Sequence, residues 1–234
     1  MSRAIVASPQ QKRQSGWMWE DRVLFIDGEA LVIDKPAGLA VHPGSRTPAS
    51  LEDHLRDLRF GFERAPAPVH RLDRDTSGCL LLARNPKAQR RFQRAFEAGA
   101  VRKDYVAIVD GVPEAEEGVI EMALSKHSTR EAGWRIVPDP DGKPAITRWR
   151  LLAARSGRAA ILLTPATGRT HQLRVHAASG LGLPIAGDPV YGDGRGPMLL
   201  HALSLGMARE GKREIEATAP LPPSFAHAGF GDAR

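Results

Sequence analysis

Short apolar segments separated by turn signals constrain the fold of this chain more than any other feature. Residues 23–26 and 30–34 are two such segments, and the Asp27-Gly28 pair between them is typical of a hairpin turn. Further strands are predicted at residues 79–83, 105–109, 134–137, 145–150, 159–163, 203–207 and 215–217. Because strands outnumber helices and come in hairpins, we predict an α/β (α+β) fold with a mixed, mostly antiparallel sheet and flanking helices.

Three helices are expected to cover this sheet. The first begins at Ser50, the second runs from Asn85-Pro86 to Gly99, and the third covers about residues 170–179. In the second helix, Phe92 and Phe96 are four residues apart, which predicts that both face the core. We also predict that residues 134–137 and 145–150 form one long hairpin, because the tip at residues 138–142 combines Asp-Pro with Asp-Gly.

Length and composition fit a folded protein that associates with a polyanion. The chain has 234 residues, 42% of them hydrophobic, and a net charge of +6. A basic protein without such a partner is the alternative, since net charge concerns association rather than fold. We expect residues 1–20 to form a flexible tail and residues 21–234 a single catalytic domain, because no linker divides them.

Several other classes of protein are disfavoured. Cys79 is the only cysteine, which excludes an intramolecular disulfide and a thiolate zinc cluster. His171 and His176 are five residues apart, so they do not share a helical face as two metal ligands would, and no nucleotide fingerprint follows a strand. No apolar stretch approaches the ~18 residues of a membrane span, and no secretory signal is visible. We therefore predict no metal, no cofactor and no membrane association, and a cytoplasmic location.

The loop that contains Asp73 is the first candidate for chemistry. His-Arg-Leu-Asp at residues 70–73 and Thr-Ser-Gly at residues 76–78 lead directly into an apolar strand. Arg71 and Arg74 flank the carboxylate and favour its ionised form, and loops on rigid strands commonly carry catalytic groups. The alternative is a simple turn or capping cluster, and Asp75 is interpreted as a turn residue.

Later segments accompany this loop in a fixed order. They are Arg102 to Gly111, the run Gly-Arg-Thr-His-Gln-Leu-Arg-Val-His at residues 168–176, and Pro184 to Gly192. Lys-Pro-Ala-Gly at residues 35–38 and Gly-Lys-Pro-Ala at residues 142–145 add to the pattern. Over about residues 21–225, the chain closely resembles the RluA-type family of RNA pseudouridine synthases.

The resemblance implies a pseudouridine synthase-type fold with a central catalytic cleft, and an isomerase that converts specific uridines of ribosomal or transfer RNA to pseudouridine. Asp73 matches the catalytic aspartate of that family, and Arg174 matches the basic residue that pairs with it. Tyr105 matches an active-site tyrosine that packs against uracil, and Arg71 an arginine that takes the place of the flipped base. Asp73 could attack C1′ or remove a ribose proton, and the sequence leaves both roles open.

The resemblance also implies an RNA substrate and no cofactor, and we expect a monomer without an obligate protein partner. Many relatives carry an S4-type RNA-binding domain, but only about twenty residues precede the first strand here, so we expect the catalytic domain to recognise RNA. The candidate contacts share a positive charge on predicted surfaces: Arg90, Arg91, Arg94, Lys126 and Arg130. For each of them, a solvated face is an equally good interpretation.

Two rival functions come from other classes. One is an RNA-binding protein that has lost catalysis, against which Asp73, Tyr105 and Arg174 argue. The other is a glycoside or nucleoside hydrolase, which the lack of a second well-placed acid disfavours.

Overall fold

The computed structural model describes residues 18–44, 47, 49–129 and 133–233. Most of the expected tail at residues 1–20, and the candidate Arg130, lie outside the described residues. Within them, no helix is long and apolar enough to cross a lipid bilayer.

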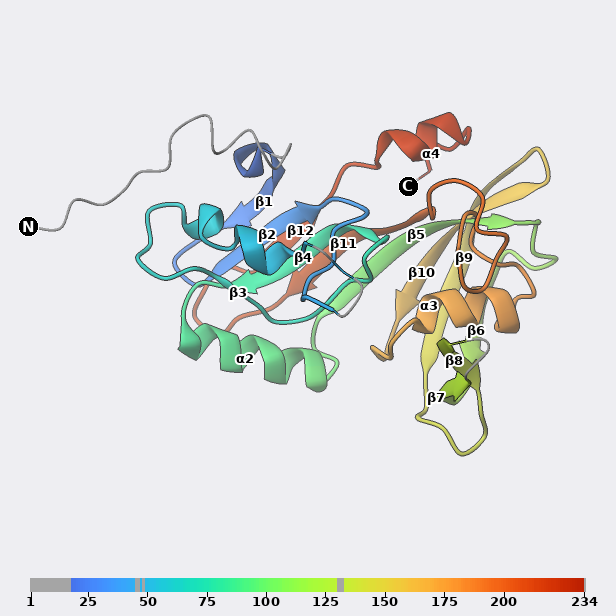
Figure 1. The fold of residues 1–234 in the computed structure, drawn as a ribbon, viewed down its shortest axis with the longest axis horizontal. Helices are drawn as coiled ribbons and strands as arrows, with labels where there is room; N and C mark the ends of the chain where they lie inside the picture. The colour runs from blue at the N-terminus through green and yellow to red at the C-terminus, as the bar shows by residue number, and fades with distance from the viewer. Residues whose placement is uncertain (1–17, 45–46, 48, 130–132, 234) are drawn as a thin grey trace, which may run out of the picture.

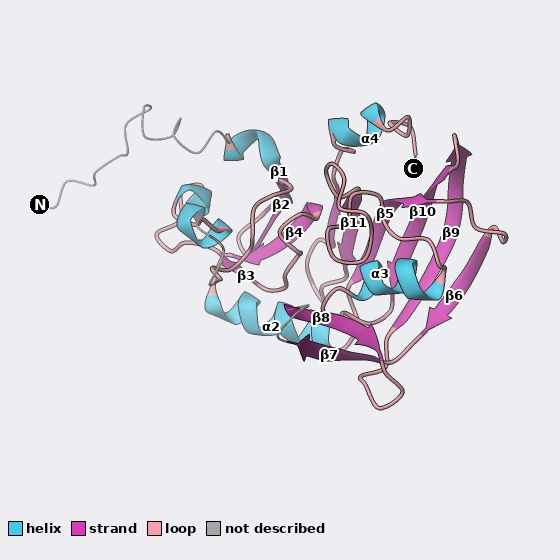
Figure 2. Cartoon of the chain, turned by 45° about the vertical axis from the view of Figure 1, so that its right-hand side comes forward, coloured by secondary structure: helices cyan, strands magenta, loops and turns pink. Residues whose placement is uncertain are grey.

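Ten strands of the described chain form one large sheet, which confirms the predicted fold class (Figures 1 and 2). The main path is β1-β2-β4-β11-β5-β10-β9-β6, with β12 beside β11 and β3 beside β4. The strands are β1 (Val23–Ile26), β2 (Ala30–Lys35), β3 (Ala67–Pro68), β4 (Ser77–Ala83), β5 (Arg102–Asp110), β6 (Glu117–Glu121), β9 (Ile146–Arg155), β10 (Arg158–Pro165), β11 (Leu200–Met207) and β12 (Ile215–Thr218).

The central contact of this sheet is the parallel pairing of β4 with β11, whereas the other pairs along the path are antiparallel. Gly78 has a φ of 104°, and a Cβ atom there would lie 2.2 Å from the carbonyl oxygen of Ala202. Only glycine permits this approach. The Thr-Ser-Gly run therefore fixes where the Asp73 loop meets the middle of the sheet.

Among the described residues, three α-helices lie against the sheet: α2 (Pro86–Glu97), α3 (Gln172–Val175) and α4 (Pro223–His227). The predicted α2 is confirmed, and the Asn85 side chain caps it by accepting a hydrogen bond from the Ala88 N–H. The predicted third helix is observed as α3 followed by a π-helical turn, His176–Gly180. Helix α4 was not predicted from the sequence.

The helix predicted from Ser50 is wrong in type. This segment forms two 3₁₀ helices, Leu51–His54 and Asp57–Arg59, and the second ends at Phe60 in the left-handed region with φ of 44°. Leu51 and Leu58 are fully buried all the same. Burial of both leucines accounts for their helical spacing in the sequence, and the left-handed backbone at Phe60 ends the second 3₁₀ helix.

The long hairpin predicted from residues 134–150 is also wrong. β8 (Gly133–Pro138) pairs with β7 (Leu124–Thr129) in a separate two-stranded sheet, and β9 pairs with β10 and β6. The chain does turn at Asp139–Gly142, but Lys143 then exchanges backbone hydrogen bonds with Leu124. β7 has the polar sequence Leu-Ser-Lys-His-Ser-Thr, so its pattern did not identify it as the partner.

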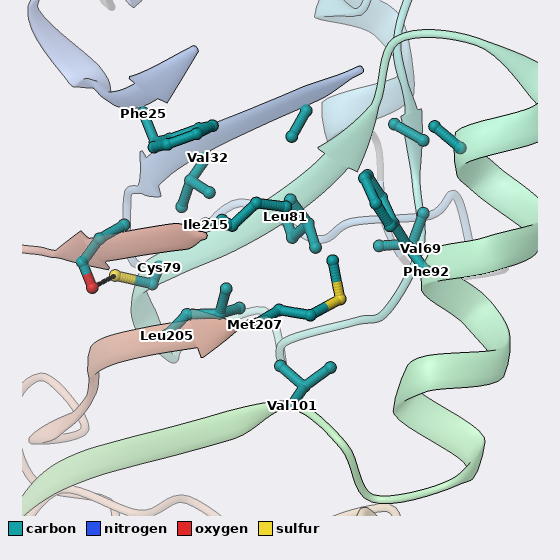
Figure 3. Packing of buried hydrophobic residues seen from close by; sticks show 14 of the residues in the cluster. Phe25, Val32, Val69, Cys79, Leu81, Phe92, Val101, Leu205, Met207 and Ile215 are labelled. Atoms are coloured by element: carbon teal, nitrogen blue, oxygen red, sulfur yellow. Dashed lines mark hydrogen bonds between the residues drawn. The ribbon is translucent and has the colours of Figure 1, made fainter. Parts of the chain in front are cut away.

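Two groups of core side chains support the site from opposite halves of the sheet. Phe92 of α2 is fully buried against Val69, near Met207 (Figure 3). Leu173 of α3 belongs to a second core with Ile161. Cys79 lies in the first core, and burial raises the pKa of its thiol to about 12, as expected of a small buried hydrophobe.

Candidate active site

A cleft of about 460 Å³ opens between the end of α2 and the start of α3. The Asp73 loop, β5, the loop after β10 and α3 contribute its walls. Four of the residues singled out in the sequence line it, from segments far apart in the chain: Arg71, Asp73, Tyr105 and Arg174. Its size is within the range of small-molecule sites and suits one nucleotide.

Asp73 meets its cation across the cleft rather than along the loop. Arg174 Nη1 donates to Asp73 Oδ2 at 3.0 Å, and the side chain of Asp73 keeps 20% of its surface exposed. Arg74, expected from its position to favour the charge on Asp73, instead forms a two-point ion pair with Asp75. The ion pair of Asp73 therefore joins two residues that are 101 positions apart in the sequence.

Sequence reasoning missed the second partner of Arg174. Its Nε and Nη2 both donate to Asp188 at 2.7 Å, and Asp188 is fully buried. Burial alone would lower the pKa of Arg174, but the hydrogen bonds and charge of Asp188, with Asp73, raise it well above its ordinary value. The signal in the sequence was the segment at residues 184–192, which contains Asp188 and accompanies the Asp73 loop.

His171 completes the contacts around Asp73. Its Nε2 is 3.7 Å from Asp73 Oδ2, and its Nδ1 is 2.9 Å from the Tyr191 hydroxyl, which also accepts the Ile136 N–H. Its backbone adopts the left-handed region with φ of 53°, a strained conformation for a non-glycine residue. Burial lowers the pKa of His171, and the nearby Arg174 lowers it further against the opposing effect of Asp73.

The Lys-Pro-Ala-Gly run explains how the Asp73 loop is held. Lys35 is fully buried, and its ammonium donates to the carbonyl oxygens of Pro36, Leu39 and Arg74. The Gly38 N–H also donates to the Arg74 carbonyl, at 2.9 Å. Burial lowers the pKa of Lys35 to about 7, although the carboxylates nearby favour its charge. The Lys-Pro-Ala-Gly run at residues 35–38 therefore supports the backbone beside Asp73.

His70 fixes the other end of the same loop. Its Nε2 accepts the Leu81 N–H at 2.9 Å, and its ring stacks on Phe96 with centroids 4.3 Å apart. Burial, with the charge of Lys103, lowers the pKa of His70 to about 3, so it stays neutral.

Gln172 fixes the start of α3 through hydrogen bonds of its side-chain amide. Its amide donates to the Ile146 carbonyl and to Thr147 Oγ1, both at 3.0 Å. Its carbonyl oxygen accepts from Thr167 Oγ1 and the Arg169 N–H. With these bonds made, the Thr-His-Gln run places His171 and Arg174 on the side of α3 that faces the loop.

Tyr105 forms a wall of the cleft on β5. Burial raises the pKa of its hydroxyl, and the charge of Asp73 raises it further, so the phenol is neutral at physiological pH. Lys103 lies two residues earlier on the strand, lines the same cleft, and has its pKa lowered by burial.

The other candidates for RNA contact lie outside this cleft. Arg90 and Arg94 are exposed on α2, and Arg91 forms an ion pair with Glu29. Lys126 is exposed on β7 and lies over the ring of Trp134. In the described part of the chain, no group of three or more His, Cys, Asp or Glu side chains is arranged to bind a metal ion.

Comparison with known proteins agrees with this arrangement. The family model of the RNA pseudouridylate synthases matches residues 29–179. An RNA pseudouridine synthase of Zymomonas mobilis is 57% identical over 89% of this chain and 97% of its own. Ribosomal large subunit pseudouridine synthase C of Vibrio cholerae is 35% identical over 92% of this chain and 70% of its own.

A solved structure has the same fold. Human RNA pseudouridylate synthase domain containing 4 superposes with a TM-score of 0.76 at 27% identity, covering 90% of this chain and 92% of its own. The family model, the sequence relatives and the solved structure lead to one conclusion: the chain belongs to the RNA pseudouridylate synthase family, isomerases that convert uridine in RNA to pseudouridine.

Proposed function

We propose that this enzyme isomerises specific uridines of structured ribosomal or transfer RNA, with Asp73 as the essential carboxylate. One observation carries the proposal: Asp73 is ion-paired with the buried Arg174 while part of its carboxylate stays open to a cleft of nucleotide size. The name of the Vibrio cholerae relative supports ribosomal RNA as the first substrate to test.

The chemistry requires a carboxylate in this position. Breaking the bond between C1′ and N1 builds positive character at C1′, which a nearby carboxylate stabilises or attacks. The uracil then rotates, C5 bonds to C1′, and the proton on C5 is lost as N1 gains one. The product is an isomer of the substrate, so acid–base or nucleophilic groups of the protein suffice. Both roles of Asp73, attack at C1′ and removal of a ribose proton, remain compatible with this geometry.

Arg71 and Tyr105 are the proposed contacts of the flipped nucleotide. Arg71 is exposed at the cleft, and its planar guanidinium can stack in the space that the uracil leaves. The ring of Tyr105 offers a stacking face for the uracil inside the cleft. Because its phenol is neutral, Tyr105 contributes its ring to the resting enzyme rather than a ready phenolate base.

The hydrolase alternative needs a second acid beside Asp73, and Asp188 does not supply it. Asp188 is the other carboxylate next to Arg174, but it is fully buried and also accepts the N–H groups of Val190 and Tyr191. A hydrolytic acid or base must reach the glycosidic oxygen or a water molecule. Asp188 is therefore a positioning residue for Arg174.

The test is the Asp73→Asn substitution, with Asp75→Asn as the matched control in the same loop. Asparagine keeps the volume and the hydrogen bonding but removes the charge and the nucleophile. Chemical mapping of pseudouridines in cells with and without the enzyme identifies the substrate RNA. On that RNA, we expect Asp73→Asn to show no turnover and nearly unchanged affinity, and Asp75→Asn to turn over normally. Retention of more than a few per cent of the rate by Asp73→Asn contradicts the assignment.

A cytoplasmic location, a monomeric state and a single domain over residues 21–234 stay predictions. Gel filtration coupled to light scattering checks the second of these.

A further inference from the structure

We propose that Trp134 and Lys126, on the β7–β8 hairpin, bind an unpaired nucleotide of the RNA beside the flipped uridine, with its base stacked on the indole of Trp134. This inference rests on the proposed function, because it assigns the hairpin a role in holding the same RNA. Neither residue lines the cleft itself, so the site is a second one at its edge.

The hairpin is packed at one end and open at the other. It forms its own two-stranded sheet beside α3, apart from the large sheet (Figure 2). Leu124 and Ile136 are buried in a small core with Val175 of α3. Lys126 is opposite Ile136 in the register, and Ser128 is opposite Trp134. Since side chains alternate along strands, Lys126 and Trp134 project from the same face as the buried pair.

The hairpin face that carries Lys126 and Trp134 continues beyond the buried Leu124 and Ile136 toward Asp73. The ring centroid of Trp134 is 5.0 Å from that of His171, and His171 Nε2 is 3.7 Å from Asp73 Oδ2. One imidazole therefore separates the indole from the carboxylate. The Ile136 N–H, two residues along β8, donates to the Tyr191 hydroxyl that contacts the same imidazole, which fixes the position of the hairpin.

Trp134 is a large apolar side chain that is 49% exposed. Phe62 is comparable at 40%, but the guanidinium of Arg84 lies 3.6 Å from the centre of its ring. Among the described residues, the Trp134 ring has the His171 ring on it, with centroids 5.0 Å apart, and the ammonium of the exposed Lys126 5.4 Å from its centre. About half of the Trp134 side chain stays open beside these two contacts. An accessible indole can accept any base, because every base has a flat face that stacks on an aromatic ring.

Lys126 supplies the charge that an RNA contact needs. It forms no ion pair among the described residues, and its ammonium lies beside the indole. A base stacked on Trp134 brings its own phosphate within reach of this ammonium. The base must be unpaired, because a base inside a duplex has both faces covered by its neighbours. Flipping of the target uridine disrupts the stack next to it and releases such a base.

The test separates stacking from charge. The probes are a single-stranded oligouridylate and an abasic ribose-phosphate strand of the same length. We expect Trp134→Ala to weaken binding of the oligouridylate by about fivefold to a hundredfold, the equivalent of ~1–3 kcal/mol, and to leave the abasic strand unaffected. Trp134→Phe should keep most of the affinity. Equal weakening of both strands, or of neither, overturns the stacking proposal.

Lys126→Ala and its control Arg135→Ala test whether the positive charge of Lys126 contacts RNA phosphate. Both remove one positive charge from the hairpin, but Arg135 projects from the opposite face. We expect Lys126→Ala to weaken both strands and to lower the salt slope by about one, and Arg135→Ala to change neither. Equal effects of the two substitutions would show that only net charge matters, against the proposal.

Tryptophan fluorescence gives a readout that a folding defect does not imitate. Oligouridylate should quench the emission of the parent protein, and this quenching should be absent in Trp134→Phe. Quenching that persists in Trp134→Phe overturns the proposal. The proposal also fails if Trp134→Ala disrupts binding of a protein partner but leaves every RNA affinity unchanged. If stacking fails while Asp73→Asn still abolishes isomerisation, the proposed function stands. If the parent protein modifies no uridine, the proposed function itself has failed.

Discussion

Arg174 and Asp188 form a buried two-point ion pair in which both nitrogen–oxygen distances are 2.7 Å. The remaining nitrogen of the same guanidinium reaches Asp73 at 3.0 Å. The fully buried Asp188 thus fixes the plane of Arg174, and Arg174 in turn presents one donor to the carboxylate in the cleft. Three side chains from α3, the Asp73 loop and the loop before β11 are coupled in this way.

Removal of Arg174 should affect both stability and catalysis. Arg174→Met leaves Asp188 buried without a cation, which commonly costs ~3–5 kcal/mol in the free energy of unfolding. The double variant Arg174→Met/Asp188→Asn removes that charge, and asparagine can still accept the N–H groups of Val190 and Tyr191. We expect urea unfolding to show recovered stability in the double variant and single-turnover assays to show no recovered activity. Normal turnover by either variant would refute the partnership of Arg174 with Asp73.

The ring of Tyr105 is expected to matter more for binding than its hydroxyl. Tyr105→Phe keeps the stacking face, so its affinity for substrate RNA should equal that of the parent. Tyr105→Leu removes the aromatic face and should weaken binding by ~1–3 kcal/mol. Filter binding in the Asp73→Asn background measures both without turnover. Equal loss of affinity in the two variants would mean that the hydroxyl, not the ring, binds the RNA.

The arginines of α2 should differ in their effect on RNA. Arg90 and Arg94 are exposed, whereas Arg91 is engaged with Glu29. If they meet RNA, they bind phosphates, so the triple alanine variant should weaken binding and flatten its salt dependence by about one unit of slope for each phosphate that is no longer neutralised. We expect Arg90→Ala/Arg94→Ala to reproduce the whole change in slope. Single-turnover rates at saturating RNA should survive, and an unchanged slope would identify these side chains as a solvated face.

Lys35 predicts a specific dependence of stability on pH. Its pKa is about 7 in the folded protein against an ordinary value of 10.5, so between these values the unfolded chain binds a proton that the folded protein does not. Stability therefore rises with pH across this window and is lost as the pH falls toward 7. Relative to Lys35→Met, the parent should gain unfolding free energy from pH 7 to pH 10. Parallel unfolding curves for the two proteins over that range would refute the shift.

Much of the fold was predictable because local sequence determines local structure. The Asp-Gly turn between β1 and β2, the Asn-Pro start of α2 and the apolar run of β4 each act within a few residues. Where a polar strand was the partner, as for β7 with β8, the pattern contained no signal, and the wrong hairpin was predicted. The segment after Ser50 likewise has helical spacing of its leucines, but it forms two 3₁₀ helices instead of one α-helix.

The sequence by itself determined which side chains could do the chemistry, and the tertiary structure decided how they are paired. Asp73, Tyr105 and Arg174 were identified from their motifs, and the cleft brings them together. The burial of Asp188 behind Arg174 and the support of the Asp73 loop by Lys35 depend on contacts between distant segments. Burial raises the electrostatic cost of every unpaired charge, and only the folded chain determines which charges are buried together.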